Sequence, residues 1–187
     1  MWSAGNVTER GRIANGNFEG ENILDLYAGI GYYTLPFLSE GTRGPNGERG
    51  TGRGAAHVVA CEWNPAAIQA LKWSLSANGL EGCCTILEGD NRNQIFKPEF
   101  DRVNLGLLPT SEDGYPIALQ SLKPAGGKLH VHGLAMGGKE HEWAENLAVL
   151  LEEIGPFSCS IEHVKRVKWY APHQRHIVVD IHASPVS

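Results

Sequence analysis

The sequence predicts an α/β fold, a doubly wound parallel sheet with an antiparallel hairpin at its C-terminal end. Short apolar runs alternate with segments of helical apolar spacing, which is the order found in a parallel sheet covered by helices. The first apolar run leads into a glycine turn at Gly29 and Gly31, as expected where a buried strand passes into a helix. Two strand-like runs joined by a short polar connection close the chain and predict the hairpin.

The elements are expected in a regular order. Residues 1–21 form a polar lead-in with a loop or short helix. Strands are expected near residues 23–26, 57–62, 83–87, 100–108, 128–132, 159–170 and 176–182, and helices near 32–40, 64–79, 110–122 and 139–154. Asn64 with Pro65 has the composition of a helix start. The last predicted helix carries its apolar face on Trp143, Leu147, Leu150 and Leu151.

Composition limits the class of protein. A chain of 187 residues with 42% hydrophobic content is expected to form a single domain over residues 1–187. Residues 41–55, rich in Gly and Arg, are expected to be a disordered surface insertion. The net charge of −5 argues against nucleic-acid binding by bulk charge, so an RNA contact would need a local basic patch. The four cysteines lack metal-ligand spacing, which indicates a reduced cytoplasmic protein with no metal site. No segment is apolar enough to span a membrane.

Acidic residues lie at the ends of three successive predicted strands. Asp25 lies four residues before Gly29, Glu62 ends the second strand, and Asp90 with Asn91 follows the third. The carboxyl ends of parallel strands meet at the ligand-binding edge of such a sheet. Glu62 there can accept hydrogen bonds from both ribose hydroxyls, and Asp90 can accept one from an adenine amino group. The three positions together predict an adenosine-containing ligand.

The fourth predicted strand carries a second group of polar residues. Asn104 lies within this strand and Pro109 follows it, with Gly106 between them. Asn104 can hydrogen-bond the edge of a base, and Gly106 allows a flat base to approach the backbone. An ordinary strand followed by a proline turn is the alternative.

Six motifs in order resemble the tRNA wybutosine-synthesizing aminocarboxypropyltransferases, whose close relatives are the tRNA guanine-N1 methyltransferases. They are Ser3–Arg10 (SAGNVTER), Asp25–Tyr32 (DLYAGIGY), Ala60–Pro65 (ACEWNP), Gly89–Arg92 (GDNR), Asp101–Ser111 (DRVNLGLLPTS) and Tyr170–His173 (YAPH). The methyltransferases tend to have Arg-Leu in place of Gly5-Asn6 and a compact Asn-x-Pro in place of Asn104–Pro109, so both departures match the aminocarboxypropyl type.

The resemblance implies a class I SAM-dependent methyltransferase-like (Rossmann-like) fold. S-adenosyl-L-methionine (SAM) would be the donor, and a wybutosine precursor base of tRNA the acceptor. It also implies donor contacts from Ser3, Arg10, Asp25, Tyr27, Gly29, Gly31, Glu62, Trp63, Asp90 and Asn91, and acceptor positioning by Asn104 and Pro109. A guanidinium such as that of Arg10 suits the methionine carboxylate. The family's N-terminal tRNA-binding region is expected to be absent from residues 1–187, and a monomer is favoured.

Two questions stay open at the level of sequence. A methyltransferase acting at the same tRNA position, or a non-catalytic remnant that binds SAM or RNA, would carry much of the same pattern. The cations and aromatics of residues 165–175 suit phosphate contact and base stacking, and an ordinary solvated hairpin explains them equally well. His130, His132 and His173 are expected to be structural or surface groups.

Overall fold

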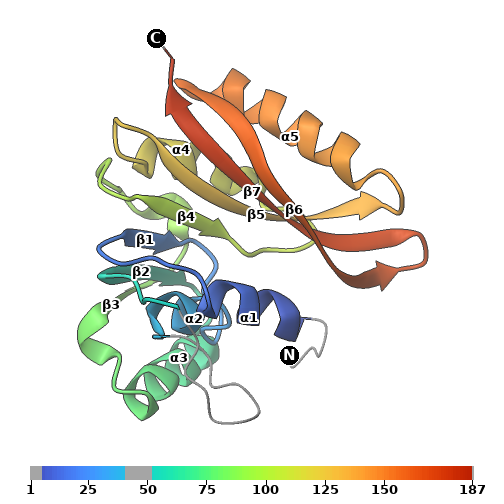
Figure 1. Ribbon diagram of the computed structural model, residues 1–187. Coiled ribbons are helices and arrows are strands. Elements are labelled where there is room, and N and C mark those ends of the chain that lie inside the picture. The colour runs from blue at the N-terminus through green and yellow to red at the C-terminus, as the bar shows by residue number, and fades with distance from the viewer. Residues whose placement is uncertain (1–5, 41–51, 187) are drawn as a thin grey trace. The chain divides into compact units, whose positions relative to one another are not determined.

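The computed structural model describes residues 6–40 and 52–186, which divide into two compact units (Figure 1). The first unit extends to Gln94 and the second begins at Ile95. The alternation of strands and helices expected from the sequence is confirmed in both units. Among the described residues, no helix is both long enough and apolar enough to cross a bilayer.

The first unit is a three-stranded parallel sheet with helices. Its elements are α1 (Val7–Ala14), β1 (Asn22–Asp25), α2 (Thr34–Leu38), β2 (His57–Glu62), α3 (Pro65–Ala77) and β3 (Cys84–Glu88). The strands lie in the order β3-β2-β1, with Asp25 opposite Ala60 and Glu62 opposite Glu88. Ile23, Phe37 and Leu71 are fully buried in its core. The parallel pairing brings the ends of β1, β2 and β3 to one edge, as the sequence predicts.

Two local features of this unit bear on the sequence predictions. The side chain of Asn64 accepts a 3.0 Å hydrogen bond from the amide of Ala66, which confirms the predicted start of α3. Residues 52–55, expected in the insertion, are instead part of the ordered unit: Arg53 forms a bridge with Asn17, and the amide of Ala55 bonds the carbonyl of Phe37 at 2.8 Å. The remainder of that predicted insertion, residues 41–51, lies outside the described residues.

The second unit contains four strands in the order β4-β5-β7-β6. The elements are β4 (Arg102–Leu105), α4 (Tyr115–Ser121), β5 (Gly127–Met136), α5 (Glu140–Ile154), β6 (Phe157–Ala171) and β7 (Gln174–Pro185). Strands β4 and β5 are parallel, whereas β7 is antiparallel to both β5 and β6. The predicted terminal hairpin is therefore confirmed, and β5 is longer than expected because β7 pairs along its whole length.

The buried face of α5 differs from the prediction. Ala144, Leu147, Ala148 and Leu151 are buried, whereas Leu150 is 37% exposed. The prediction for Leu150 is wrong because the buried residues follow one helical stripe at i, i+3, i+4 and i+7 from Ala144, and Leu150 lies beside that stripe. Trp143, at the edge of the stripe, packs its ring against Gly133 of β5, where any Cβ atom would overlap it.

Candidate functional site

The glycine turn after β1 uses its two glycines for different purposes. Gly29 has φ +56° and Gly31 has φ +93°, a region that residues with a Cβ atom adopt only with strain. A Cβ atom at Gly31 would overlap the side chain of Leu35 and lie 2.8 Å from Cδ1 of Leu71. A Cβ atom at Gly29 would meet no atom of the described residues within 4 Å. Gly31 is therefore required for packing, and Gly29 leaves an open approach to the backbone.

Glu62 connects this turn to the end of β2. Its Oε2 accepts a 2.8 Å hydrogen bond from the amide of Gly29, and its Oε1 accepts a 2.7 Å bond from the amide of Asn64. Each oxygen of a carboxylate has two acceptor positions, so one on each remains for a ligand hydroxyl. The carboxylate is thus held in place by two backbone amides while it keeps the capacity to bind a diol.

The other two predicted acidic positions differ in exposure. Asp25 is 1% exposed and accepts a 2.7 Å hydrogen bond from the hydroxyl of Thr34, so it ties β1 to α2 from inside the turn. Asp90 lies at the surface beside Arg92, whose side-chain and backbone hydrogen bonds lower the pKa of Asp90 to about 2. Asp90 is therefore ionised at neutral pH and able to accept from an amino group. Its neighbour Asn91 donates to the carbonyl of Leu26 at 2.7 Å and joins the loop after β3 to the end of β1.

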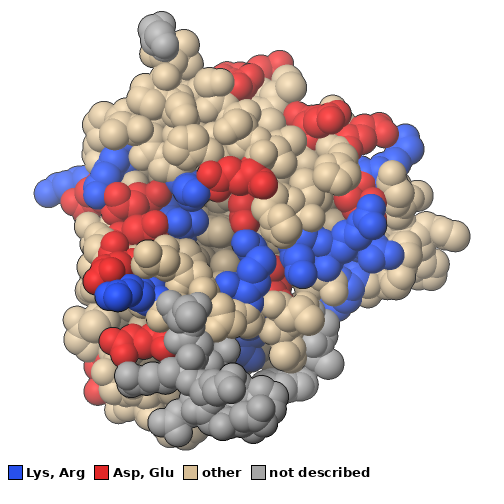
Figure 2. Space-filling view, in the orientation of Figure 1, with Lys and Arg blue, Asp and Glu red and all other residues tan. Residues whose placement is uncertain are grey.

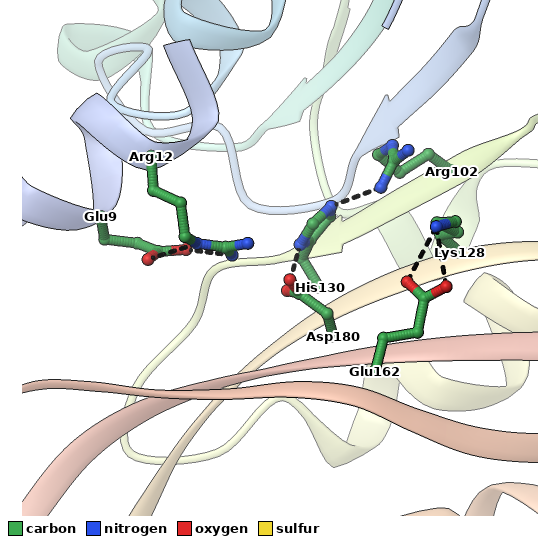
Figure 3. A network of polar contacts seen from close by, with 7 residues as sticks. All are labelled: Glu9, Arg12, Arg102, Lys128, His130, Glu162 and Asp180. Atoms are coloured by element: carbon green, nitrogen blue, oxygen red, sulfur yellow. Dashed lines mark hydrogen bonds and ion pairs between the residues drawn. The ribbon is translucent and has the colours of Figure 1, made fainter. Parts of the chain in front are cut away.

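Helix α1 presents a guanidinium close to the glycine turn. Cζ of Arg10 lies 5.2 Å from the centre of the Tyr32 ring, one residue after Gly31. Glu9 is buried and pairs with Arg12 at 2.6 Å rather than with Arg10 (Figure 3). Within the described part of the chain, the buried Nε of Arg10 has no hydrogen-bond partner. Such a buried donor costs about 1–3 kcal/mol until a partner binds it.

The remaining predicted donor contacts are less defined. Tyr27 is half-buried at the turn and Trp63 is 73% exposed after β2. Ser3 lies outside the described residues. Asn6 is a further candidate for donor binding that the sequence did not suggest. It precedes α1, and its side chain makes no hydrogen bond to the start of the helix. Its buried Oδ1 has no partner among the described residues.

In the second unit, the two predicted acceptor residues have different environments. Asn104 is 1% exposed on β4 and lies opposite His130 of β5. Pro109 is exposed in the loop that follows and is preceded by a cis peptide bond.

A buried polar chain crosses the same sheet (Figure 3). Nη1 of Arg102 lies 2.8 Å from Nε2 of His130, and Nδ1 of His130 lies 2.6 Å from Oδ1 of Asp180. A guanidinium only donates, so Nε2 of His130 accepts and its Nδ1–H donates to Asp180. His130 is thus a structural group that links β4 to β7, as expected. Only the alternation of Lys128, His130 and His132 along an otherwise apolar strand could have suggested this chain from the sequence.

The fold is that of an α/β protein in which acidic residues lie at the ends of three neighbouring parallel strands, the edge at which such sheets bind their ligands. A family model described as the TRM5/TYW2 methyltransferase domain matches residues 1–145. The chain belongs to this family.

Relatives and a solved structure agree with this assignment. The Arabidopsis thaliana "tRNA wybutosine-synthesizing protein 2/3/4" is 44% identical over 97% of this chain and 18% of its own length. The Danio rerio "tRNA wybutosine-synthesizing protein 2 homolog" is 38% identical over 100% of this chain and 52% of its own. The crystal structure of M. jannaschii TYW2 in complex with AdoMet is 29% identical, with a TM-score of 0.84 over 100% of this chain and 78% of that one. The chain thus spans about half or less of these two curated relatives, and the predicted fold class is confirmed.

Proposed function

We propose that this chain is the catalytic domain of a SAM-dependent tRNA aminocarboxypropyltransferase. It transfers the 3-amino-3-carboxypropyl group of SAM to a wybutosine precursor base next to the anticodon, at position 37 of tRNA(Phe), and releases methylthioadenosine. The observation that carries the proposal is Arg10, a guanidinium stacked on Tyr32 beside the glycine turn, with a buried Nε that has no partner among the described residues. A methionine carboxylate would supply that partner.

Each donor residue has a role that follows from its hydrogen-bonding capacity. Glu62 accepts from the ribose hydroxyls, and Asp90 accepts from the adenine amino group while the backbone amide of Asn91 meets a ring nitrogen. Arg10 and Ser3 hold the amino-acid arm. Gly29 provides the open backbone against which the ligand lies. The AdoMet complex of the M. jannaschii relative supports SAM as the ligand.

The reaction needs alignment more than it needs a protein nucleophile. The positively charged sulfur of SAM makes all three adjacent carbons electrophilic, and orientation decides which one reacts. A ring carbon of the base attacks the γ-carbon of the arm, the γ-carbon–sulfur bond breaks, and its electron pair returns to sulfur to give neutral methylthioadenosine. The ring carbon then loses its proton to solvent. Alignment of this kind contributes up to about 7–11 kcal/mol to lowering a barrier. Asn104 and Pro109 are proposed to position the base.

The location and assembly of the protein form part of the same proposal. All four cysteines are free thiols, and burial raises the pKa of Cys61 to about 12, which keeps that thiol protonated. Free thiols support a reducing compartment, the cytoplasm. We propose a monomer, which size-exclusion chromatography with light scattering tests directly.

One assay tests the reaction. The protein is incubated with precursor tRNA and SAM that carries label in either the carboxyl or the methyl group, and the label in tRNA is counted. We expect label from the carboxyl group and none from the methyl group. Methyl label in the tRNA would show a methyltransferase, and no label from either position would show a binding remnant; both results would overturn the proposal.

A further inference from the structure

The end of the β6–β7 hairpin exposes two aromatic side chains beside an open pocket. Trp169 is 57% exposed and Tyr170 is 50% exposed. The pocket has a volume of about 320 Å³ and is lined by residues 169–173. The chain reverses here at Pro172 and His173, and His173 adopts φ +63°. Both aromatic residues therefore lie next to the turn, at the end of the hairpin. Two neighbouring aromatic rings beside a pocket form a contiguous apolar surface, unlike the singly exposed Trp73 of α3.

The Trp169 ring is held in one position before any partner binds. The guanidinium of Arg175, its register partner on β7, lies 3.9 Å from the ring centre. The edge of the ring packs against Gly137, where a Cβ atom would approach it to 2.7 Å. The amide of Gly137 also donates a 2.9 Å hydrogen bond to the carbonyl of His173, which fastens the turn to the end of β5. A ring fixed in this way loses little further freedom when a ligand stacks on it.

Positive charge surrounds these aromatics. Residues 165–175 contain four Lys or Arg side chains and no Asp or Glu, in a protein whose net charge is −5. Figure 2 shows Lys and Arg side chains gathered over the β6–β7 hairpin. Glu140 orients two of them: its carboxylate is 3.2 Å from Nε of Arg166 and 3.4 Å from Nε of Arg175, and its side chain is 3% exposed. The pKa of Glu140 is lowered most by a hydrogen bond to its carboxylate from its own backbone amide. The charges of Arg166 and Arg175 lower it further.

We propose that this hairpin end, residues 165–175, binds an unpaired nucleotide of the RNA substrate. A base stacks on the exposed Trp169 and Tyr170, and its phosphate contacts Arg166 and Lys168. Aromatic faces interleaved with cations suit single-stranded nucleic acid, because every base has a face to stack and every nucleotide a phosphate to neutralise. The inference rests on the proposed function for the identity of the RNA, and the residues that carry it are separate from those that bind the donor.

The test measures binding of fluorescently labelled precursor tRNA by anisotropy, for the intact chain and its variants without SAM. Trp169→Ala should weaken binding at least about 5-fold, since stacking on an aromatic side chain contributes substantially per base. Trp169→Phe keeps a flat ring and should recover most of the affinity. Lys168→Gln removes one phosphate contact and should reduce the slope of log K against log salt by about 0.7. A fully paired RNA duplex should bind Trp169→Ala and the unmodified chain equally.

Trp73 provides the matched control. It is 73% exposed on α3, outside the hairpin, so Trp73→Ala should leave tRNA affinity unchanged. Thermal unfolding followed by circular dichroism must show that each variant is folded. Equal tRNA affinity of Trp169→Ala and Trp73→Ala, or equal losses for tRNA and duplex, would overturn the inference.

The label-transfer assay distinguishes this inference from the proposed function. If the unmodified chain transfers the carboxyl label and Trp169→Ala keeps its tRNA affinity, the hairpin inference is wrong and the proposed function stands. If Trp169→Ala loses tRNA affinity and the unmodified chain transfers no label, the hairpin inference stands and the proposed function is wrong.

Discussion

The amide of Gly29 donates a 2.8 Å hydrogen bond to Oε2 of Glu62, a residue 33 positions later in the chain. The bond joins the turn after β1 to the end of β2. The second oxygen of the same carboxylate accepts from Asn64, at the start of α3. One side chain therefore organises the glycine turn and the next helix while it faces the proposed ribose position.

Replacing Glu62 should impair donor binding more than a loss of charge alone predicts. In Glu62→Gln, the amide NH₂ group must face one of two backbone N–H donors, Gly29 or Asn64, so one hydrogen bond becomes a repulsion. We expect SAM affinity to fall at least about tenfold, which corresponds to about 1.4 kcal/mol. Isothermal titration calorimetry measures it. Glu88→Gln is the control, because the side chain of Glu88 is paired with Lys72 at the exposed surface. Equal SAM affinities for the two variants would contradict this role of Glu62.

The two glycines of the turn should separate stability from binding. Gly31→Ala adds overlap with Leu35 and Leu71 to the backbone strain, so its free energy of unfolding should fall by about 1–3 kcal/mol more than that of Gly29→Ala. Gly29→Ala carries only the strain of its positive φ, about 1–2 kcal/mol. Its added methyl group projects into the open approach, so it should lose SAM affinity. Urea unfolding and calorimetry give the two quantities, and the reverse order of stabilities would show that the turn is packed differently.

Two adjacent leucines of α5 provide a test of its buried face. Leu151 is fully buried and Leu150 is 37% exposed. Leu151→Ala should lower the free energy of unfolding by about 2–5 kcal/mol. Leu150→Ala should change it by about 0.5 kcal/mol or less. Chemical denaturation of both variants measures the difference. Similar decreases in the free energy of unfolding would show that Leu150 is buried, as the sequence pattern predicts.

The stability of the protein should fall in mild acid through His176. Burial lowers the pKa of His176 to about 4, with a smaller contribution from Lys168, compared with 6.5 for the ordinary side chain. Between pH 6.5 and about 4 the unfolded chain binds a proton that the folded chain does not, so the free energy of unfolding decreases as the pH falls through this window. Nε2 of His176 lies 3.0 Å from Nδ1 of His132, so one hydrogen bond joins the two rings.

The measurement for His176 is urea unfolding at a series of pH values. His176→Gln should show a shallower decrease between pH 6.5 and 4 than the unmodified chain. His141→Gln, on the exposed surface of α5, should follow the unmodified chain. A pH dependence unaffected by His176→Gln would assign the acid sensitivity to other groups.

The sequence was sufficient for the features that depend on neighbouring residues. The start of α3 at Asn64 and Pro65, the glycine turn and the terminal hairpin follow from local backbone preferences and from the period of apolar residues. The strand-end positions of Glu62 and Asp90 follow from the same periods, because parallel strands end at a common edge. These predictions need no knowledge of which residues meet.

Only the tertiary structure could decide the contacts between residues distant in the chain. The bond from Gly29 to Glu62, the buried chain Arg102–His130–Asp180 and the pairing of Glu140 with Arg175 each join separate elements. The exposure of Leu150 and the ordered structure of residues 52–55 also depend on which residues pack against them. Local pattern specifies which helix, strand or turn a residue belongs to, but the partners of its side chain are set by how strands align and helices pack, which no single segment encodes.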